Sequence, residues 1–447
     1  MNPLHNIAPV DGRYHDKVIE LQKYFSEFAL IKYRIFVETQ YLIALKKLGI
    51  KELEKISESD IESIRMIFTT FNINDAEKVK EIEKITNHDV KAVEYFIKTR
   101  LENIGLSAIT EFVHFGLTSQ DINNTAFPIM LYNAIQEVMM PHFVALVAKL
   151  RSMALNWREI AMLARTHGQP ASPTTLGKEI FVFVERLEQQ ILVLNEIELR
   201  VKFGGATGNL NAHLVAYPEI DWRSFADNFT SEFLKMKRSQ HTTQIDHYDS
   251  MAQVFDALSR INTILIDFSR DIWTYISMDY FKLKIIAKEV GSSAMPHKVN
   301  PIDFENAEGN LGIANALLRF LSEKLPISRL QRDLTDSTVV RNIGVPMAHM
   351  LIAIKSVVKG LSKLELNKEA LDKDLDDNWA VVSEAIQTIL RKISYPEPYE
   401  ALKELTRGKS HIDRASIHEF IDTLKIEEKL KDELKTISPY NYTGYKI

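Results

Sequence analysis

The chain has 447 residues, of which 45% are apolar and 26% are charged. A chain of this length can bury the cores of several packed domains and does not need disulfide staples. The formal net charge is −5, so there is no overall positive field to attract nucleic acid or an anionic membrane. We therefore expect no nucleic acid and no membrane as partners, and an anionic substrate would require a locally positive pocket.

Cysteine is absent, which excludes disulfides, thiolate metal sites and thiol nucleophiles. The N-terminal sequence MNPLHNIAPVDGRY lacks the basic and apolar regions of a signal peptide, and no run of 18 uncharged apolar residues follows it. These features predict a soluble protein of the cytoplasm.

The backbone is predicted to be almost entirely helical. Glycine (16) and proline (14) are few for this length, so the turns that separate short strands are scarce. Apolar residues recur at steps of three and four, which places them on one face of a helix. Five segments carry such stripes: 143–157, 184–194, 254–275, 311–321 and 347–361. A repeat close to 3.5 residues indicates a bundle of nearly parallel long helices, and such helices often associate across subunits.

The pattern of apolar residues changes twice along the chain. Residues 1–112 resemble a smaller helical module with solvated amphipathic helices, and the segments beyond residue 364 are shorter and rich in Lys and Glu. We therefore predict three helical domains in an all-α fold: an N-terminal domain (1–112), a central long-helix bundle (113–364) and a C-terminal domain (365–447).

Four polar stretches interrupt the amphipathic pattern. Residues 118–121 (TSQD) fit a capping box, although a helix N-terminus with hydroxyls also binds anions. Residues 165–170 are expected to close the first long helix, where His167 is either a favourable charge on the helix dipole or a catalyst. Residues 86–89 (TNHD) fit either a helix N-cap or part of a functional site. Residues 291–301 (GSSAMPHKVNP) cannot be helical, and such a loop within a bundle indicates a function.

Two further polar groups carry weaker signals. The glycine-rich residues 204–209 lack the strand and helix of a nucleotide-binding loop, so a connecting turn explains them. His241, Asp246 and His247 match no reliable zinc spacing, and we interpret them as surface residues.

The loop sequence GSSAMPHKVNP resembles the signature of the fumarase/aspartase superfamily, whose members eliminate fumarate from succinyl-type substrates. Five other stretches resemble the adenylosuccinate lyase family of the longer bacterial type: 8–14, 86–96, 166–179, 242–246 and 331–342. The likeness continues to residues 402–408 and so covers nearly the whole chain. One departure is Gln120, which stands where the family motif has Glu.

This resemblance implies the cleavage of adenylosuccinate to AMP and fumarate, and of the carboxamide ribotide SAICAR to AICAR, both in purine biosynthesis. The proton that leaves lies next to an ionised carboxylate, so catalysis depends on donors aimed at a developing dianion. By resemblance Ser292 is the general base, supported by Lys298. His167 is the general acid for the departing nitrogen, Glu305 is the carboxylate that pairs with it, and His88 contacts the substrate.

Other family residues bind the substrate. The residues that match are Arg13, Tyr14, Asp89, Thr118, Ser119, Thr166, Gln244, Asn300, Arg332, Ser337 and Arg341. Arginine forks suit phosphate and carboxylate, and they supply the local positive pocket that an acidic chain needs. The resemblance also implies a homotetramer with a twenty-helix core and active sites shared between subunits, nucleotide substrates as small-molecule partners, and no metal or organic cofactor.

Two alternatives remain open at this stage. Argininosuccinate lyase or an aspartase would share the 291–301 loop, but would not need Arg13, Tyr14 or the arginines of 331–342 for a phosphate. A helical scaffold without activity would be expected to lose His167, Ser292 or Lys298, and all three are present.

Overall fold

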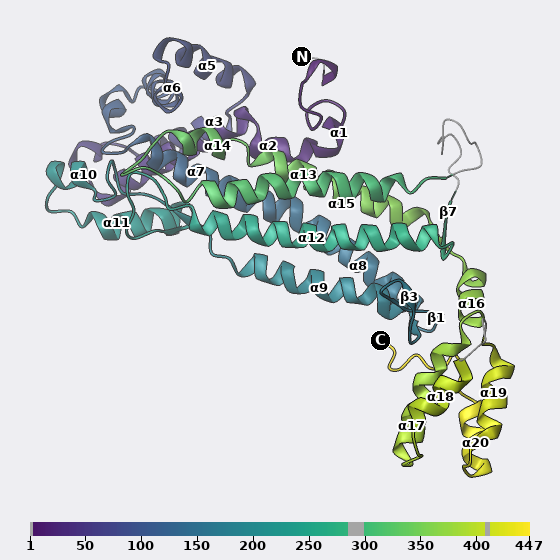
Figure 1. Ribbon diagram of the computed structural model, residues 1–447. Coiled ribbons are helices and arrows are strands. Elements are labelled where there is room, and N and C mark those ends of the chain that lie inside the picture. Colours follow the sequence, from purple (N-terminus) through teal and green to yellow (C-terminus); the bar gives the residue numbers. More distant parts are fainter. Residues whose placement is uncertain (1–2, 285–298, 407–411) are drawn as a thin grey trace. The chain divides into compact units, whose positions relative to one another are not determined.

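The computed structural model describes residues 3–284, 299–406 and 412–447 and confirms the predicted helical fold (Figure 1). The first helices are α1 (His15–Val18), α2 (Gln22–Phe25), α3 (Glu27–Leu48), α4 (Glu58–Thr69), α5 (Ile73–Thr86), α6 (Asp89–Asn103) and α7 (Ser119–Ala134). The following ones are α8 (Met140–Asn156), α9 (Leu176–Glu196), α10 (Asn211–Ala216), α11 (Trp222–Asn228), α12 (Asp249–Ser277), α13 (Ile302–Lys324) and α14 (Thr335–Val340). The last are α15 (Gly344–Lys363), α16 (Lys368–Asp376), α17 (Ser383–Lys392), α18 (Pro398–Thr406), α19 (Arg414–Thr423) and α20 (Glu428–Lys435).

The strands are short and form two-stranded pairs. They are β1 (Ala161–Met162), β2 (Arg165–Thr166), β3 (Gln169–Pro170), β4 (Thr174–Thr175), β5 (Arg200–Val201), β6 (Lys237–Arg238), β7 (Phe281–Leu283) and β8 (Leu364–Leu366). β1 pairs with β4, β2 with β3 and β7 with β8, all antiparallel, whereas β5 pairs with β6 in parallel.

All five helices predicted from apolar stripes are present as α8, α9, α12, α13 and α15. In α12 the stripe residues Val254, Leu258, Ile261, Leu265 and Phe268 are at most 2% exposed, and each such side chain contributes about 1.5–3 kcal/mol of burial free energy. The predicted end of the first helix was wrong. α8 ends at Asn156, and residues 165–170 form the β2–β3 hairpin.

The described chain forms two compact units of non-contiguous segments. One comprises residues 1–143, 190–263 and 309–355, and the other comprises 144–189, 264–308 and 356–447. Helices α8, α9, α12, α13 and α15 contribute residues to both units. The division into three domains at residues 112 and 364 therefore remains a prediction.

Helix α3 is the central helix of the first unit. It begins at Ser26, whose hydroxyl accepts a hydrogen bond from the Ala29 N–H (3.1 Å), and ends at Gly49, whose φ of 89° suits a residue without a side chain. The helix is buried on most sides. Two of its charged residues, Arg34 and Glu38, are buried as well and are only 1% exposed. Buried charges of this kind need partners, and Arg34 forms an ion pair with Asp89.

The second unit contains its own C-terminal core. Helices α17, α18, α19 and α20 cluster in Figure 1 around buried apolar side chains. These include Trp379, Val382, Ile386, Leu390, Ile417, Ile421, Leu424 and Leu434. This core holds helices α17 to α20 together.

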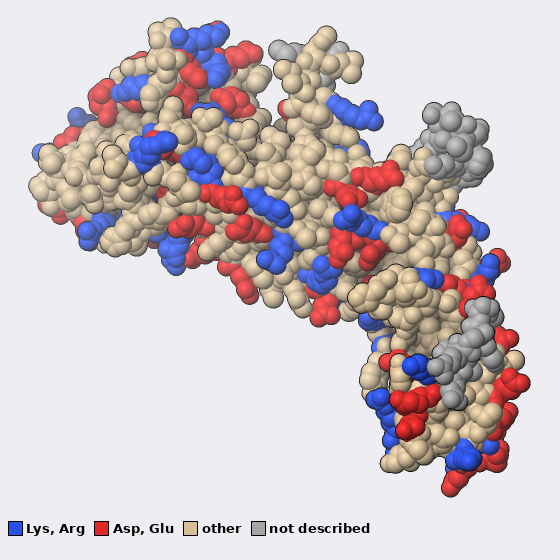
Figure 2. Space-filling view, viewed as in Figure 1, with Lys and Arg blue, Asp and Glu red and all other residues tan. Residues whose placement is uncertain are grey.

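Two properties of the described chain bear on possible partners: the distribution of charge on its surface and the apolar length of its helices. Acidic and basic side chains are interspersed over the face seen in Figure 2, in keeping with the small net charge. The stretches Ser119–Asn156 and Thr335–Lys363 are long and apolar enough to cross a membrane by length and composition alone. Core helices meet the same criterion, and 72% of the apolar window in the second stretch is buried.

Candidate active site

A buried arginine and an exposed arginine converge on Asp89 in the first unit. Arg34 Nη2 donates to Asp89 Oδ2 at 2.7 Å, and its Nε donates to Asn123 Oδ1 at 2.9 Å. Arg341 also donates to Asp89 Oδ2. Burial raises the pKa of the Asp89 carboxyl, but the charge of Arg34 and the hydrogen bond from Arg341 outweigh it and hold the pKa well below its usual range. Asp89 is therefore a carboxylate that fixes Arg341 in place.

His88 is the N-cap of α6, one of the two interpretations left open by the sequence. Its Nδ1 accepts a hydrogen bond from the Lys91 N–H at 3.1 Å, and its Nε2 lies 3.4 Å from Ser119 Oγ. A neutral imidazole whose Nδ1 is an acceptor carries its proton on Nε2. The half-exposed ring can therefore present an N–H beside Ser119 to a bound anion.

The N-terminus of α7 is organised by Asp121, which is fully buried. The Thr118 N–H donates to Asp121 Oδ2 at 2.8 Å, as expected for the capping box. Asp121 Oδ1 accepts from Lys202 Nζ (2.7 Å) and from the N–H of Gly204 (2.8 Å) and Gly205 (3.0 Å). Burial lowers the pKa of Lys202, and the Asp121 charge opposes that shift. This buried ion pair thus joins the loop at 204–209 to the helix start that presents Thr118 and Ser119.

Arg332 and Ser337 form a second cluster in the same unit. Arg332 Nη2 donates to Ser337 Oγ at 3.0 Å, and its Nη1 donates to Gln244 Oε1 at 3.4 Å. Gln120 Nε2 donates to the same Ser337 oxygen at 3.3 Å, and its Oε1 is buried without a hydrogen-bond partner among the described residues. The structure therefore brings together Gln244, Arg332 and Ser337, three residues predicted to bind substrate.

Beneath this cluster lies a buried network that the sequence did not predict. Tyr248 Oη donates to Asp336 Oδ2 at 2.9 Å and accepts from Asn124 Nδ2 at 2.6 Å. Asp246, interpreted above as a surface residue, is 3% exposed, so that part of the interpretation was wrong. Asp246 Oδ2 accepts from the Tyr248 N–H at 2.9 Å, and burial raises the pKa of its carboxyl. His241 and His247 are exposed as expected.

His167 occupies the tip of the β2–β3 hairpin in the second unit. His167 and Gly168 both have positive φ, 54° and 74°, as in the tightest two-residue hairpin turns. Thr166 precedes them on β2, and both Thr166 and His167 are exposed. His167 forms no hydrogen bond or ion pair with the residues that the structure describes. The ring is therefore free to contact a ligand.

The other predicted residues have separate places. Glu305 lies in the first turn of α13 and accepts from Trp273 Nε1 at 3.0 Å, whereas its pairing with His167 remains a prediction. Asn300 is half-buried just before α13. Ser292 and Lys298 lie outside the described residues. Arg13 lies over the ring of Tyr14, with the guanidinium carbon 5.9 Å from the ring centroid.

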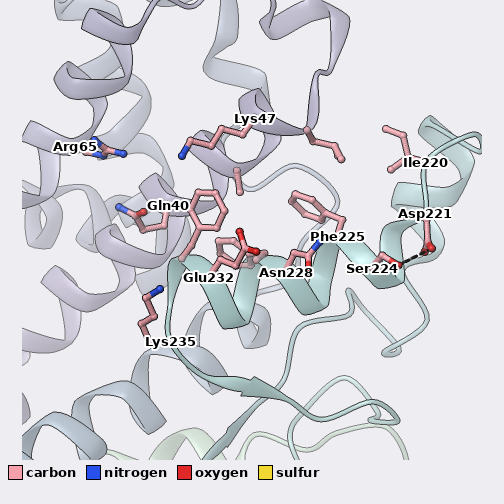
Figure 3. Close-up of a pocket in the computed structure, with 14 residues that line it drawn as sticks. Gln40, Lys47, Arg65, Ile220, Asp221, Ser224, Phe225, Asn228, Glu232 and Lys235 are labelled. Atoms are coloured by element: carbon pink, nitrogen blue, oxygen red, sulfur yellow. Dashed lines mark hydrogen bonds between the residues drawn. The ribbon is translucent and has the colours of Figure 1, made fainter.

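Two cavities in the first unit differ in their relation to these residues. A cavity of about 560 Å³ is lined by Arg341 and by Val10 and Asp11, which precede Arg13 and Tyr14 in the chain. A larger one of about 780 Å³ lies beside α11, where Lys47, Arg65 and Lys235 surround aromatic side chains (Figure 3). It contains none of the predicted site residues, so volume alone does not identify the site.

Comparison with known proteins identifies the family. Residues 12–314 match a lyase family model, and residues 328–443 match the adenylosuccinate lyase C-terminal model. The chain is 58% identical to the adenylosuccinate lyase of Dictyostelium discoideum, over 99% of this chain and 97% of the relative. It is 49% identical to that of Escherichia coli K12, over 100% of this chain and 98% of the relative. The chain belongs to the adenylosuccinate lyase family.

Solved structures agree on the fold of this lyase. A 3-carboxy-cis,cis-muconate lactonizing enzyme from Pseudomonas putida superposes with a TM-score of 0.76, covering 95% of this chain and 94% of that one, at 19% sequence identity. At this identity the likeness supports the fold only.

Several residues that organise the site of this lyase were missed by sequence reasoning. Arg34 holds Asp89, Lys202 holds Asp121, and Tyr248 and Asp336 lie behind Arg332. A usable signal existed for Arg34, because a charged residue inside the apolar stretch of α3 must have a buried partner. No local signal marked Lys202, since its partner lies 81 residues away in the chain.

Proposed function

We propose that this chain eliminates fumarate from adenylosuccinate to give AMP, and from SAICAR to give AICAR, as a carbon–nitrogen lyase of purine nucleotide biosynthesis. The observation that carries this proposal is the 58% identity to an adenylosuccinate lyase over 99% of the chain. The C-terminal family match supports the same substrate class, because it covers residues 332–341 and their arginines.

The substrate carries a phosphate and two carboxylates, and the first unit offers suitable donors. Arg332 and Arg341 have side chains 20% and 38% exposed, so each can reach a ligand while being held by protein partners. Planar guanidinium groups bind such oxyanions through two parallel hydrogen bonds. The N-terminus of α7 adds Thr118 and Ser119, and the N-cap of α6 adds the N–H of the His88 ring. In this proposal these groups, with Arg13, Tyr14 and Gln244, hold the nucleotide and succinyl groups.

The acid step falls to His167. When the C–N bond breaks, the purine nitrogen takes up the electron pair and requires a proton. An imidazole has an ordinary pKa of about 6.5 and can donate one near neutral pH. The exposed hairpin tip leaves His167 free to reach the leaving group, with Thr166 beside it. Glu305 would stabilise its charged form.

The base step falls to Ser292. The carbon-bound proton is very weakly acidic, because its loss adds a second negative charge to the carboxylate group. Lys298 and Asn300 would stabilise that charge as it develops, and Lys298 would favour the alkoxide of Ser292. Water must be excluded when the proton moves, since an unperturbed serine is too weak a base.

We further propose that the protein acts in the cytoplasm as a homotetramer whose active sites combine residues of several subunits. Large apolar side chains are 38–59% exposed along α9, α12 and α13, and they include Val182, Leu192, Val193, Trp273, Ile313 and Phe320. Association would bury these side chains. It would also bring residues of the two units of different copies into shared sites.

One ultraviolet assay tests the activity. Purified protein is offered adenylosuccinate, argininosuccinate, aspartate and malate in turn, and release or consumption of fumarate is followed by absorbance. Of these four compounds we expect rapid turnover of adenylosuccinate only, and SAICAR, offered separately, should be a second substrate. Turnover of argininosuccinate or aspartate, with none of adenylosuccinate, would overturn the proposal.

A further inference from the structure

The hairpin that carries His167 is too short to hold its own shape. It consists of two strands of two residues each, with the pairs Arg165↔Pro170 and Thr166↔Gln169. An isolated two-stranded hairpin is marginally stable at best, even when it is longer. A proton donor, however, must be held within a few tenths of an ångström of its productive position. Something outside the hairpin must therefore fix it.

The second unit supplies such a support at the start of the hairpin. Arg165 Nη2 lies 2.8 Å from Asp374 Oδ1 and 2.7 Å from Asp374 Oδ2, and Asp374 belongs to α16. The side chains of Arg165 and Asp374 are 31% and 18% exposed, so the pair is partly shielded from water. The Asp374 carboxylate is itself held, because Tyr280 Oη donates to it and Asn378 Nδ2 donates to its Oδ1 at 3.1 Å.

A second carboxylate lies at the far end of the same segment. Ser172, two residues after β3, donates to Glu384 of α17, and Tyr442 Oη donates to the same Glu384 oxygen at 3.0 Å. At the base of the hairpin, the Ala171 N–H donates to the Ala164 carbonyl at 2.8 Å. The segment 164–172 is thus attached to the C-terminal helices on both sides of His167, while the imidazole itself remains unattached.

We propose that Asp374 is a positioning residue for His167, acting through Arg165 to orient the hairpin tip toward the leaving group. Glu384 assists from the other end of the segment. This inference rests on the proposed function, in which His167 protonates the departing nitrogen. It gives the C-terminal region a part in catalysis without contact between Asp374 and the substrate.

A double-mutant cycle tests this inference in the full-length protein. The variants are Asp374→Asn, His167→Ala and the combination, each compared with wild type in kcat, KM and melting temperature. Because a misplacement of about 1 Å can cost on the order of 100-fold, we expect Asp374→Asn to lower kcat by about 10-fold to 100-fold with KM changed less than about twofold. In the His167→Ala background the same substitution should change kcat by less than about twofold, since there is no longer an acid to position.

Two further variants guard against misfolding and non-specific effects. Arg165→Met removes the nitrogen that contacts both Asp374 oxygens, and should reproduce the kcat defect if Asp374→Asn does not fold. Glu188→Gln removes the exposed Arg151–Glu188 pair of α8 and α9 and should leave kcat unchanged.

The outcomes separate this inference from the proposed function. If His167→Ala is nearly as active as wild type, the acid assignment is wrong and the positioning role fails with it. If His167→Ala is severely impaired but Asp374→Asn has normal kcat, or slows the enzyme equally in both backgrounds, the positioning role alone is overturned. A fall in melting temperature without a fall in kcat would likewise assign Asp374 to stability only.

Discussion

Individual side chains in the proposed site fall into exposed ones, which are available to a ligand, and buried ones, which hold the exposed ones in place. His88, Ser119, Arg332 and Arg341 are at least partly exposed, whereas Asp121 is fully buried. The buried groups fix the orientation of the exposed ones, because a solvated arginine or serine without such partners samples several rotamers. Substitutions of the two kinds should therefore differ, with catalytic losses at ligand-facing positions and stability losses at supporting ones.

Replacement of either proposed proton-transfer group should abolish most turnover. Ser292→Ala removes the base and His167→Ala removes the acid, so each should lower kcat by several orders of magnitude while circular dichroism and melting temperature stay near wild type. Steady-state kinetics with adenylosuccinate provide the measurement. Near-normal kcat in either variant would contradict the role assigned to that residue.

Loss of Lys202 should destabilise the fold. Lys202→Met leaves the fully buried Asp121 carboxylate without its charged partner, and breaking such a pair typically costs about 3–5 kcal/mol. Urea unfolding measures the change in free energy of unfolding. Lys237→Met is the matched control, because it breaks an exposed pair with Glu198 (2.9 Å) and should cost less than about 1 kcal/mol. Equal losses in the free energy of unfolding for Lys202→Met and Lys237→Met would show that the buried pair stabilises the fold no more than the exposed one.

Asp271 should make stability depend on pH. Burial, together with the negative charges of Asp267 and Glu179, raises the pKa of Asp271 to about 6. The folded state thus holds this proton more tightly than the unfolded state, whose aspartate pKa is about 3.9, so stability falls as pH rises from about 4 to 6. Asp271→Asn should raise the melting temperature at pH 7.5 and leave it unchanged at pH 4. If the melting temperatures of wild type and Asp271→Asn differ by the same amount at pH 4 and at pH 7.5, Asp271 does not titrate in this range.

Among the secondary-structure elements, the β2–β3 hairpin carries the most demanding local geometry. Both of its turn residues have positive φ, which costs a non-glycine residue roughly 1 kcal/mol. His167 carries this conformational cost. Gly168 does not, because glycine has no side chain and adopts positive φ readily. Gly309 in α13 has no such constraint, because a Cβ there would meet no atom within 4 Å, so glycine at this position is a weakness and not a requirement.

Two glycine substitutions test this contrast. Gly168→Ala meets no atom within 4 Å but places a side chain at φ +74°, so it should distort the tip and lower kcat several-fold. Gly309→Ala in α13 also meets no atom within 4 Å and has ordinary helical φ, so it should be neutral or stabilise by about 0.5–1 kcal/mol. Activity assays and thermal melts distinguish them. Unchanged kcat in Gly168→Ala would show that the tip tolerates distortion.

At the scale of the whole molecule, the exposed apolar side chains of the long helices predict association between subunits. Phe320 is 51% exposed on α13, and Phe320→Glu should weaken the proposed tetramer by placing a charge in its proposed apolar interface. Ile85→Lys on α5, where Ile85 is 87% exposed outside the long helices, is the control and should not alter association. Light scattering after gel filtration measures the mass, and activity should fall together with it if sites are shared. A Phe320→Glu variant that remains tetrameric would exclude α13 from the interface.

The helical class, the five long helices and the family all follow from local information. Apolar residues at steps of three and four specify a helix face wherever the chain lies, and the 291–301 loop identifies the superfamily by its residue types alone. The N-cap at His88 and the capping box at Thr118 could be proposed for the same reason, because their hydrogen bonds join residues three apart.

The partners of the charged groups could not be derived in this way. Arg165 lies 209 residues from Asp374, and Arg341 lies 252 residues from Asp89. Which carboxylate meets which arginine depends on how helices pack, and no periodicity within one segment encodes that pairing. The same limit explains the error at residues 165–170, where a histidine that locally resembles a helix end forms a hairpin supported by the C-terminal helices.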